Sequence, residues 1–331
     1  MTTVRRTRTT ALVVTVAAVV MLLAAPLLFA LQMRHDGVEP HRAVLAVAGP
    51  TIVAQALAER SDALAGRPFD ARAVRSVAAT RDGVREGTAA LGVIIDFGQP
   101  RDILLVSTTT DPDLVDAFRA RLDAISSGFG RQLDVEEVAP SAGDQVGRRT
   151  PYVLTFLGVF IGVGLALGLS LVRGPIAATA ARGAVRLAGL AVAGAITGAA
   201  LAATGPGDDL WVRALAGGAV VTVVAWLVLA LESVLGLWGL ALATAALSGI
   251  AVPLLSYVEP VALPDPWREV VPWTPHGAGL DLARDLLFFG SSSGRSWAVL
   301  STWAVVAVLA LLAARTHRPG EAKGGAAVHR D

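Results

Sequence analysis

The sequence contains no cysteine and only one lysine, and each absence excludes a class of protein. Without cysteine the chain can form no disulfide, thiolate metal site, iron–sulfur cluster or cysteine nucleophile. The single lysine, Lys323, lies in a tail rich in Gly and Ala, and no Gly-x-x-x-x-Gly-Lys motif precedes it. The chain therefore has no P-loop, and we expect it to have no ATPase activity of its own.

Charged residues are also scarce, at 17% of 331 residues, whereas 54% are hydrophobic and the mean hydropathy is +0.60. This bias is typical of a membrane protein and not of a soluble enzyme. The net charge of +1 argues against a nucleic-acid binder that relies on bulk basicity. We therefore expect contact with the lipid bilayer and none with nucleic acid.

Six apolar segments are long enough to cross a bilayer, which takes about 20 helical residues. They are 11–31, 152–172, 184–203, 212–231, 234–255 and 297–314. We interpret the first as an uncleaved anchor and not a signal peptide, because its apolar run is long and no good Ala-x-Ala site follows it. Only Glu232 and Ser233 separate the fourth from the fifth. We interpret that break as a tight hairpin turn at the membrane surface, and the alternative is one long buried helix.

Basic residues in the short loops predict the orientation of these spans. Ten lie on one side of the predicted membrane and four on the other. The ten are Arg5, Arg6, Arg8, Arg173, Arg182, Arg186, Arg315, Arg318, Lys323 and Arg330, and the four are Arg213, Arg268, Arg284 and Arg295. Both termini are thus predicted to be cytoplasmic, residues 1–10 as a short tail and residues 315–331 as a disordered one.

The segment 32–151 is then outside the cell, and its roughly 120 residues are enough for a core of its own. Its pattern predicts strand, helix, strand, helix, strand, strand, helix, strand. The turn at Gln99-Pro100 joins the third and fourth strands in a hairpin, and Asp111 caps a helix that has Pro112 at its first position. The predicted fold class is an α-helical polytopic membrane protein with six transmembrane helices, with a small α/β extracytoplasmic domain inserted between the first and second spans.

No pattern in the chain predicts a catalytic, cofactor or metal site. Residues 290–294 match the nucleophile elbow Gly-x-Ser-x-Gly, but the later histidines, His317 and His329, lie across the membrane, so a surface loop is the better interpretation. Two histidines and two acids within 35–41 could hold a divalent metal, but their spacing matches no known template, and a solvated linker is preferred.

No Asp, Glu, Lys, Arg or His lies inside a predicted span, and Arg186 and Arg213 lie at span ends. Ion-coupled carriers usually keep such residues in mid-membrane. The pattern argues against a proton-driven antiporter and an intramembrane protease. Any transport would be powered by another subunit, or would pass an apolar or amphipathic substrate.

Three Gly-x-x-x-Gly motifs lie in the second and third spans, where paired glycines let helices approach closely. They are Gly158 with Gly162, Gly164 with Gly168, and Gly194 with Gly198. They predict either packing within one subunit or a seam between two subunits.

The outer segment 256–296 contains five prolines, followed by a predicted amphipathic helix at 278–289. It is either an interfacial loop or a re-entrant element that closes a translocation path. The candidate lid residues are Trp267, Trp273, Leu282, Leu286 and Phe289.

Three stretches carry a resemblance to a known family. They are the helix–strand unit 81–96, the approach to the second span at 140–147, and the outer stretch Trp273-Thr-Pro-His-Gly-Ala278 with Asp281, Arg284 and Phe288-Phe289-Gly290. With the layout of an anchor, an outer domain and five further spans (152–314), the chain resembles membrane subunits of type-2 ABC exporters, in particular the YhgE/Pip (phage infection protein) branch.

The resemblance implies a permease-like subunit in the bacterial cell membrane, working as a homo- or heterodimer with a separate ABC ATPase. It further implies that the loop bearing Arg173, Arg182 and Arg186 couples to that ATPase, although these arginines are also explained as determinants of topology. Two other classes stay open: a surface or secretion-accessory protein whose outer domain binds a partner, and, less favoured, a membrane enzyme.

Overall fold

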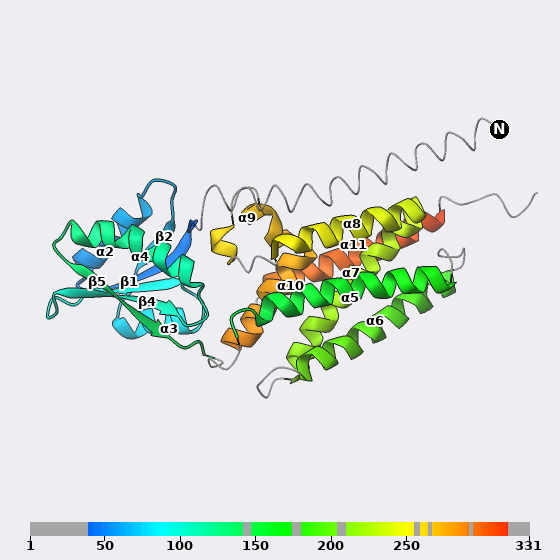
Figure 1. Cartoon of the computed structure of the whole chain (residues 1–331), viewed down its shortest axis with the longest axis horizontal. Coiled ribbons are helices and arrows are strands. Elements are labelled where there is room, and N and C mark those ends of the chain that lie inside the picture. The colour runs from blue at the N-terminus through cyan, green and yellow to red at the C-terminus, as the bar shows by residue number, and fades with distance from the viewer. Residues whose placement is uncertain are drawn as a thin grey trace, which may run out of the picture.

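A computed structural model of the 331-residue chain describes residues 39–141, 147–173, 180–203, 210–254, 259–263, 267–290 and 294–316. These residues form an α/β domain and a helical bundle, and the α/β domain lies at one end of the bundle (Figure 1). The predicted N-terminal tail, the first span at 11–31, residues 35–38 of the cluster at 35–41 and residues 317–331 of the C-terminal tail lie outside the described residues.

The α/β domain is built on a five-stranded sheet in the order β2-β1-β3-β4-β5. The strands are β1 (Ala43–Ala48), β2 (Phe69–Ala73), β3 (Leu91–Ile94), β4 (Arg101–Ser107) and β5 (Gln132–Val138). β3 and β4 are antiparallel, which confirms the predicted hairpin, and the other neighbouring pairs are parallel. Because β1, β3 and β4 are apolar on both faces, the sheet needs cover on both sides.

Helices supply that cover: α2 (Thr51–Asp62) and α4 (Pro112–Ser127) pack on one face and α3 (Val77–Arg85) on the other (Figure 1). α4 begins as the sequence predicted, with the Asp111 side chain accepting from the N–H of Asp113 and Pro112 at the first position. The predicted order of elements in this domain is confirmed.

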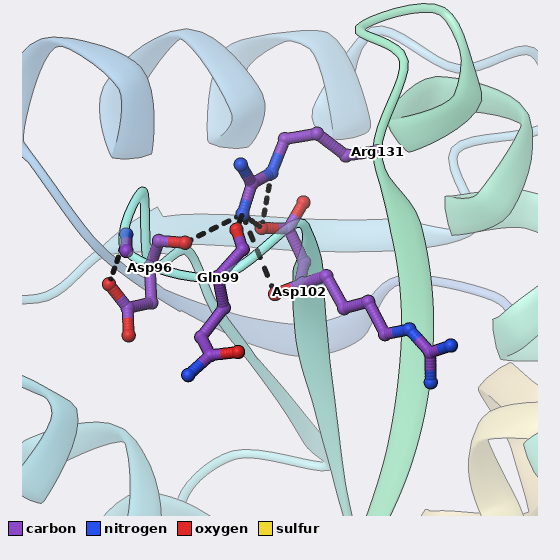
Figure 2. Close-up of polar contacts among 6 residues, drawn as sticks. Asp96, Gln99, Asp102 and Arg131 are labelled. Carbon is purple, nitrogen blue, oxygen red and sulfur yellow. Dashed lines mark hydrogen bonds and ion pairs between the residues drawn. The ribbon is translucent and has the colours of Figure 1, made fainter.

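An arginine clamp lies at the end of the sheet where β4 and β5 begin (Figure 2). Arg131 donates from Nε to Asp102 Oδ1 at 2.8 Å, and from Nη2 to the carbonyl oxygens of Asp96 at 2.8 Å and Gln99 at 3.0 Å. Burial raises the pKa of Asp102 and the Arg131 guanidinium opposes that rise. The clamp ties the β3–β4 turn to the start of β5, and we interpret it as structural.

The bundle contains α5 (Thr150–Arg173), α6 (Ala180–Ala203), α7 (Leu210–Leu235), α8 (Leu237–Leu254), α10 (Pro275–Arg284) and α11 (Gly294–Thr316). Four of these helices, α5, α6, α7 and α11, are long and apolar enough to cross a membrane. They correspond to the predicted second, third, fourth and sixth spans. In α8 the described apolar stretch is the shorter Leu237–Leu247.

The break between the predicted fourth and fifth spans lies four residues later than expected. α7 continues through Glu232 and Ser233 to Leu235, and the chain turns at Gly236, whose φ is 67°. Glycine is the first residue there that enters the left-handed region without steric cost.

The expectation that no acidic residue lies inside a span is therefore wrong. Glu232 falls within the candidate span Ala214–Leu235, is only 2% exposed, and accepts a 2.6 Å hydrogen bond from Ser170 Oγ on α5. The hydrogen bond from the serine satisfies one carboxylate oxygen, which reduces the cost of burying Glu232 in the bundle.

Candidate functional site at the junction of the two parts

The segment before α11 folds back into the bundle. Thr274 Oγ1 accepts from the N–H of Gly277 at 3.1 Å and caps α10, and Pro275 occupies its first turn. Residues 275–280 are all buried, and α10 packs against α5, α7 and α11. The predicted amphipathic helix thus begins three residues early, and it continues as a π-helical turn, η3 (Asp285–Phe289).

His276 is fully buried near the start of α10. Its Nε2 lies 2.7 Å from the carbonyl oxygen of Leu247 in α8. Burial lowers the pKa of His276 to about 4, against the smaller raising effect of that hydrogen bond. The imidazole is therefore neutral at physiological pH, donates from Nε2, and ties α10 to α8.

The five candidate lid residues do not share one surface. Leu282 is fully buried in the bundle core and Leu286 packs against the same core, whereas Trp273 is 61% exposed beneath the Arg295 guanidinium. Trp267 packs beside a small separate cluster.

Phe289 contacts the α/β domain. Its ring lies so close to Gly87 that a Cβ at that glycine would be 2.6 Å from the ring, and Ser141 Oγ donates to the Phe289 carbonyl at 2.8 Å. The end of η3 is therefore a contact between the two parts of the molecule.

A largely buried ion pair lies at the same junction. Glu259 Oε2 lies 3.1 Å from Arg284 Nη2, and the other Glu259 oxygen accepts from the N–H of Asp111 at 2.9 Å. Burial acts to lower the pKa of Arg284, but the negative charges of Glu259 and Asp281 outweigh it, so the net pKa is raised and the guanidinium stays charged. One carboxylate thus holds α10 to the start of α4.

Further apolar and hydrogen-bond contacts add to this connection. The short 3-10 helix η1 (Pro260–Ala262) places Ala262 in the core of the α/β domain, and the Val261 carbonyl accepts from the N–H of His41 at 2.8 Å. Arg148 Nη1 likewise donates to the Thr110 carbonyl oxygen at 3.0 Å. The junction is therefore tied by apolar, polar and ionic contacts together.

Between these contacts lies a cavity of about 260 Å³, here called the junction cavity. Its bundle wall includes Glu259, Asp281, Arg284, Asp285 and Phe289, and its α/β wall includes Arg42, Thr88, Ser107, Thr109 and Thr110. Among the described cavities it has the most polar and charged lining, so it is the candidate functional site. The described residues contain no group of three or more His, Cys, Asp or Glu that could hold a metal.

The glycine motifs separate into two kinds. Gly158 and Gly162 of α5 lie against α7, and a Cβ at Gly162 would be 2.7 Å from the Val221 carbonyl oxygen. A Cβ at Gly194 or Gly198 of α6 would likewise meet Thr222 or Ala214 of α7. These two motifs pack helices within one subunit.

The third motif, Gly164 with Gly168, has open space around it and lines a groove of about 470 Å³ between α5 and α6. Arg186, a candidate coupling residue, lines the same groove and is 8% exposed. The side chains of Arg173 and Arg182 lie outside the described residues.

A scan against protein families finds no match, and neither the curated proteins nor the solved structures contain a significant relative. The site therefore has to be interpreted from its own chemistry. Sequence analysis named Asp281 and Arg284 only within the outer stretch that carries the family resemblance and, for Arg284, among the outer basic residues, and it did not single out Glu259. Arg284 meets Glu259 across 25 residues and Glu259 meets Asp111 across 148, so no local pattern signals the pairing.

Proposed function

We propose that this protein is a permease-like membrane subunit of an ABC-type exporter, powered by a separate ATPase subunit. The observation that carries the proposal is the placement of α10, a helix buried among the candidate spans. Its Arg284 is ion-paired with Glu259, and Glu259 in turn accepts the N–H of Asp111 in the α/β domain. A protein that needs its spans only as an anchor has no use for such a helix. A movement of the spans, however, would be passed through it to the α/β domain.

In this proposal the α/β domain is extracytoplasmic and the opposite end of the bundle faces the cytoplasm. That opposite end contains the end of α5, the start of α6 and the turn between α7 and α8 (Figure 1). It also contains Arg173 and Arg182, the proposed contacts for an ATPase. Arg186 is buried in the groove beside α5, so we assign it to helix packing and not to the partner surface.

The test is affinity purification of the full chain from native membranes in a mild detergent. We expect an ABC ATPase to copurify, and we expect ATP hydrolysis by the complex but not by the chain alone. Charge reversal at Arg173 and Arg182 should release the ATPase, whereas reversal of the exposed Arg119 on α4 should not. ATP turnover by the partner-free chain would contradict the proposal.

A specific observation supports the accessory alternative. Ile52 and Phe97 follow the adjacent strands β1 and β3 at the end of the sheet away from the bundle, and they are 83% and 60% exposed. Exposed apolar side chains at a domain tip favour a protein partner. If no ATPase copurifies, and a stable partner is lost on Phe97→Ser but retained on the control Val135→Ser, the accessory function replaces the exporter.

A further inference from the structure

The junction cavity has, on its two walls, a carboxylate and a guanidinium that form no hydrogen bond or ion pair within the described residues. Glu259 and Arg284 neutralise each other. Asp281 on the bundle wall and the Arg42 side chain on the α/β wall form no hydrogen bond or ion pair within the described part of the chain. Asp285 also lines the cavity, but it already interacts with another group and is not counted as available for a ligand. The charges left over are therefore one carboxylate and one guanidinium.

Several charged groups surround Asp281. Removal from solvent raises the pKa of Asp281 to about 6, with Asp285 adding to the rise and Arg284 and Arg295 opposing it. Glu259 lies beyond Arg284, which it neutralises. A carboxylate that is desolvated and unpartnered is unfavourable, and a ligand N–H donor with a positive charge would relieve that cost.

Arg42 lies on the α/β wall as an exposed residue with a constrained backbone. Its φ is 50°, in the left-handed region that residues with a Cβ rarely adopt, and its N–H donates to the Arg67 carbonyl at 2.9 Å. Such conformations persist where the surrounding structure imposes them. The backbone of the residue before β1 is thus strained, and its guanidinium is of a type that binds anionic groups.

We propose that the junction cavity binds a small zwitterion, a molecule with a protonated amine and a phosphate or carboxylate, through Asp281 and Arg42. The hydroxyls of Ser107 and Thr109, 2.8 Å apart on the same wall, supply further polar contacts. A volume of about 260 Å³ suits a ligand of the size of phosphoethanolamine. The ligand is either a free solute or the headgroup of phosphatidylethanolamine. This proposal does not depend on transport, and it stands whether or not an ATPase copurifies.

The test uses the full chain in nanodiscs of phosphatidylcholine, titrated calorimetrically with O-phosphoethanolamine at pH 7.5. We expect saturable binding that Asp281→Asn and Arg42→Gln each weaken roughly 10- to 100-fold, the range for hydrogen bonds to charged groups. The matched controls Asp123→Asn and Arg119→Gln, on the exposed face of α4, should bind like the wild type. Ethanolamine and inorganic phosphate, each carrying half of the ligand, should bind at least tenfold more weakly.

The same titration in nanodiscs that contain phosphatidylethanolamine identifies the source of the ligand. A loss of apparent affinity there, with a higher thermal midpoint for the wild type but not for Asp281→Asn, assigns the site to the lipid headgroup. Equal affinity in both bilayers assigns it to a free solute. Absence of binding together with no thermal response to phosphatidylethanolamine would overturn the proposal, and so would wild-type affinity in Asp281→Asn. Thermal unfolding of each variant shows that it is folded.

Discussion

Glu259 and Arg284 form a 3.1 Å ion pair whose side chains are only 11% and 18% exposed, and the pair lies where the bundle meets the α/β domain. The same glutamate accepts the N–H of Asp111 at the start of α4. Because the pair is largely removed from water, breaking it leaves an uncompensated charge. It is therefore the contact whose loss should be felt most strongly.

We expect Glu259→Gln to lower the free energy of unfolding by about 1–3 kcal/mol, less than for a fully buried pair because some solvent reaches it. The control is Glu39→Gln, which breaks the exposed Glu39–Arg121 pair of similar length, 2.9 Å, and should change stability by about 1 kcal/mol or less. Thermal unfolding in nanodiscs measures both. Equal losses of unfolding free energy in the two variants would show that the junction pair contributes no more than an exposed ion pair.

Asp281 makes stability depend on pH in the absence of ligand. Its pKa is raised to about 6 in the folded protein, mainly by burial, above the ordinary value of 3.8. The folded state therefore binds the proton more tightly, so the carboxylate is unfavourable above about pH 6 and costs nothing below about pH 4. Asp281→Asn should therefore raise the thermal midpoint at pH 7.5 and leave it unchanged at pH 4. The gain in free energy of unfolding at pH 7.5 should be at most about 3 kcal/mol. The exposed control Asp123→Asn should show neither effect, and an equal gain at both pH values would contradict the assignment.

Ligand binding should show the opposite dependence on pH. An amine pairs with Asp281 only when the carboxylate is ionised, so the affinity for O-phosphoethanolamine should fall as the pH drops through about 6. Calorimetric titrations between pH 5 and pH 8 measure this. A flat profile over that range would mean that Asp281 does not contact the amine.

The glycines of α5 and α6 should differ in their tolerance of a methyl group. A Cβ at Gly198 would lie 2.1 Å from the Ala214 carbonyl oxygen of α7, whereas Gly168 has nothing within 4 Å. We expect Gly198→Ala to destabilise by about 1–3 kcal/mol through overpacking. Gly168→Ala should be neutral or slightly stabilising, because alanine favours the helix. If Gly168→Ala is the damaging change, that motif has a partner outside the subunit, which crosslinking of two copies would then reveal.

The predicted orientation can be tested by cysteine labelling, since the chain has no cysteine of its own. Ser127 at the end of α4 is exposed and is a suitable position for labelling. Ser107 in the same domain is only 8% exposed, so a cysteine there would label poorly. With an impermeant thiol reagent on intact cells, Ser127→Cys should react and Thr179→Cys, between α5 and α6, should not. Labelling of Thr179→Cys alone would reverse the proposed topology.

Much of the architecture follows from local patterns. The order of strands and helices in the α/β domain, the β3–β4 hairpin and the Asp111 cap of α4 were all predictable, because alternation, turn residues and capping act over a few neighbouring positions. The candidate spans followed from apolar length in the same way. The position of the α7–α8 turn did not, since Glu232 and Ser233 look like a break until Ser170 is seen beside the carboxylate.

The sequence by itself determined a membrane protein with a small α/β domain and no P-loop, because hydropathy, strand pattern and missing residue types are properties of the chain alone. Only the tertiary structure decided that α10 is buried, that Glu259 joins Arg284 to the start of α4, and that Arg42 and Asp281 line one cavity. The physical reason is sequence distance. An amphipathic pattern shows which residues are polar, but water, a headgroup and a carboxylate from another segment satisfy a charge equally well, and only folding selects among them.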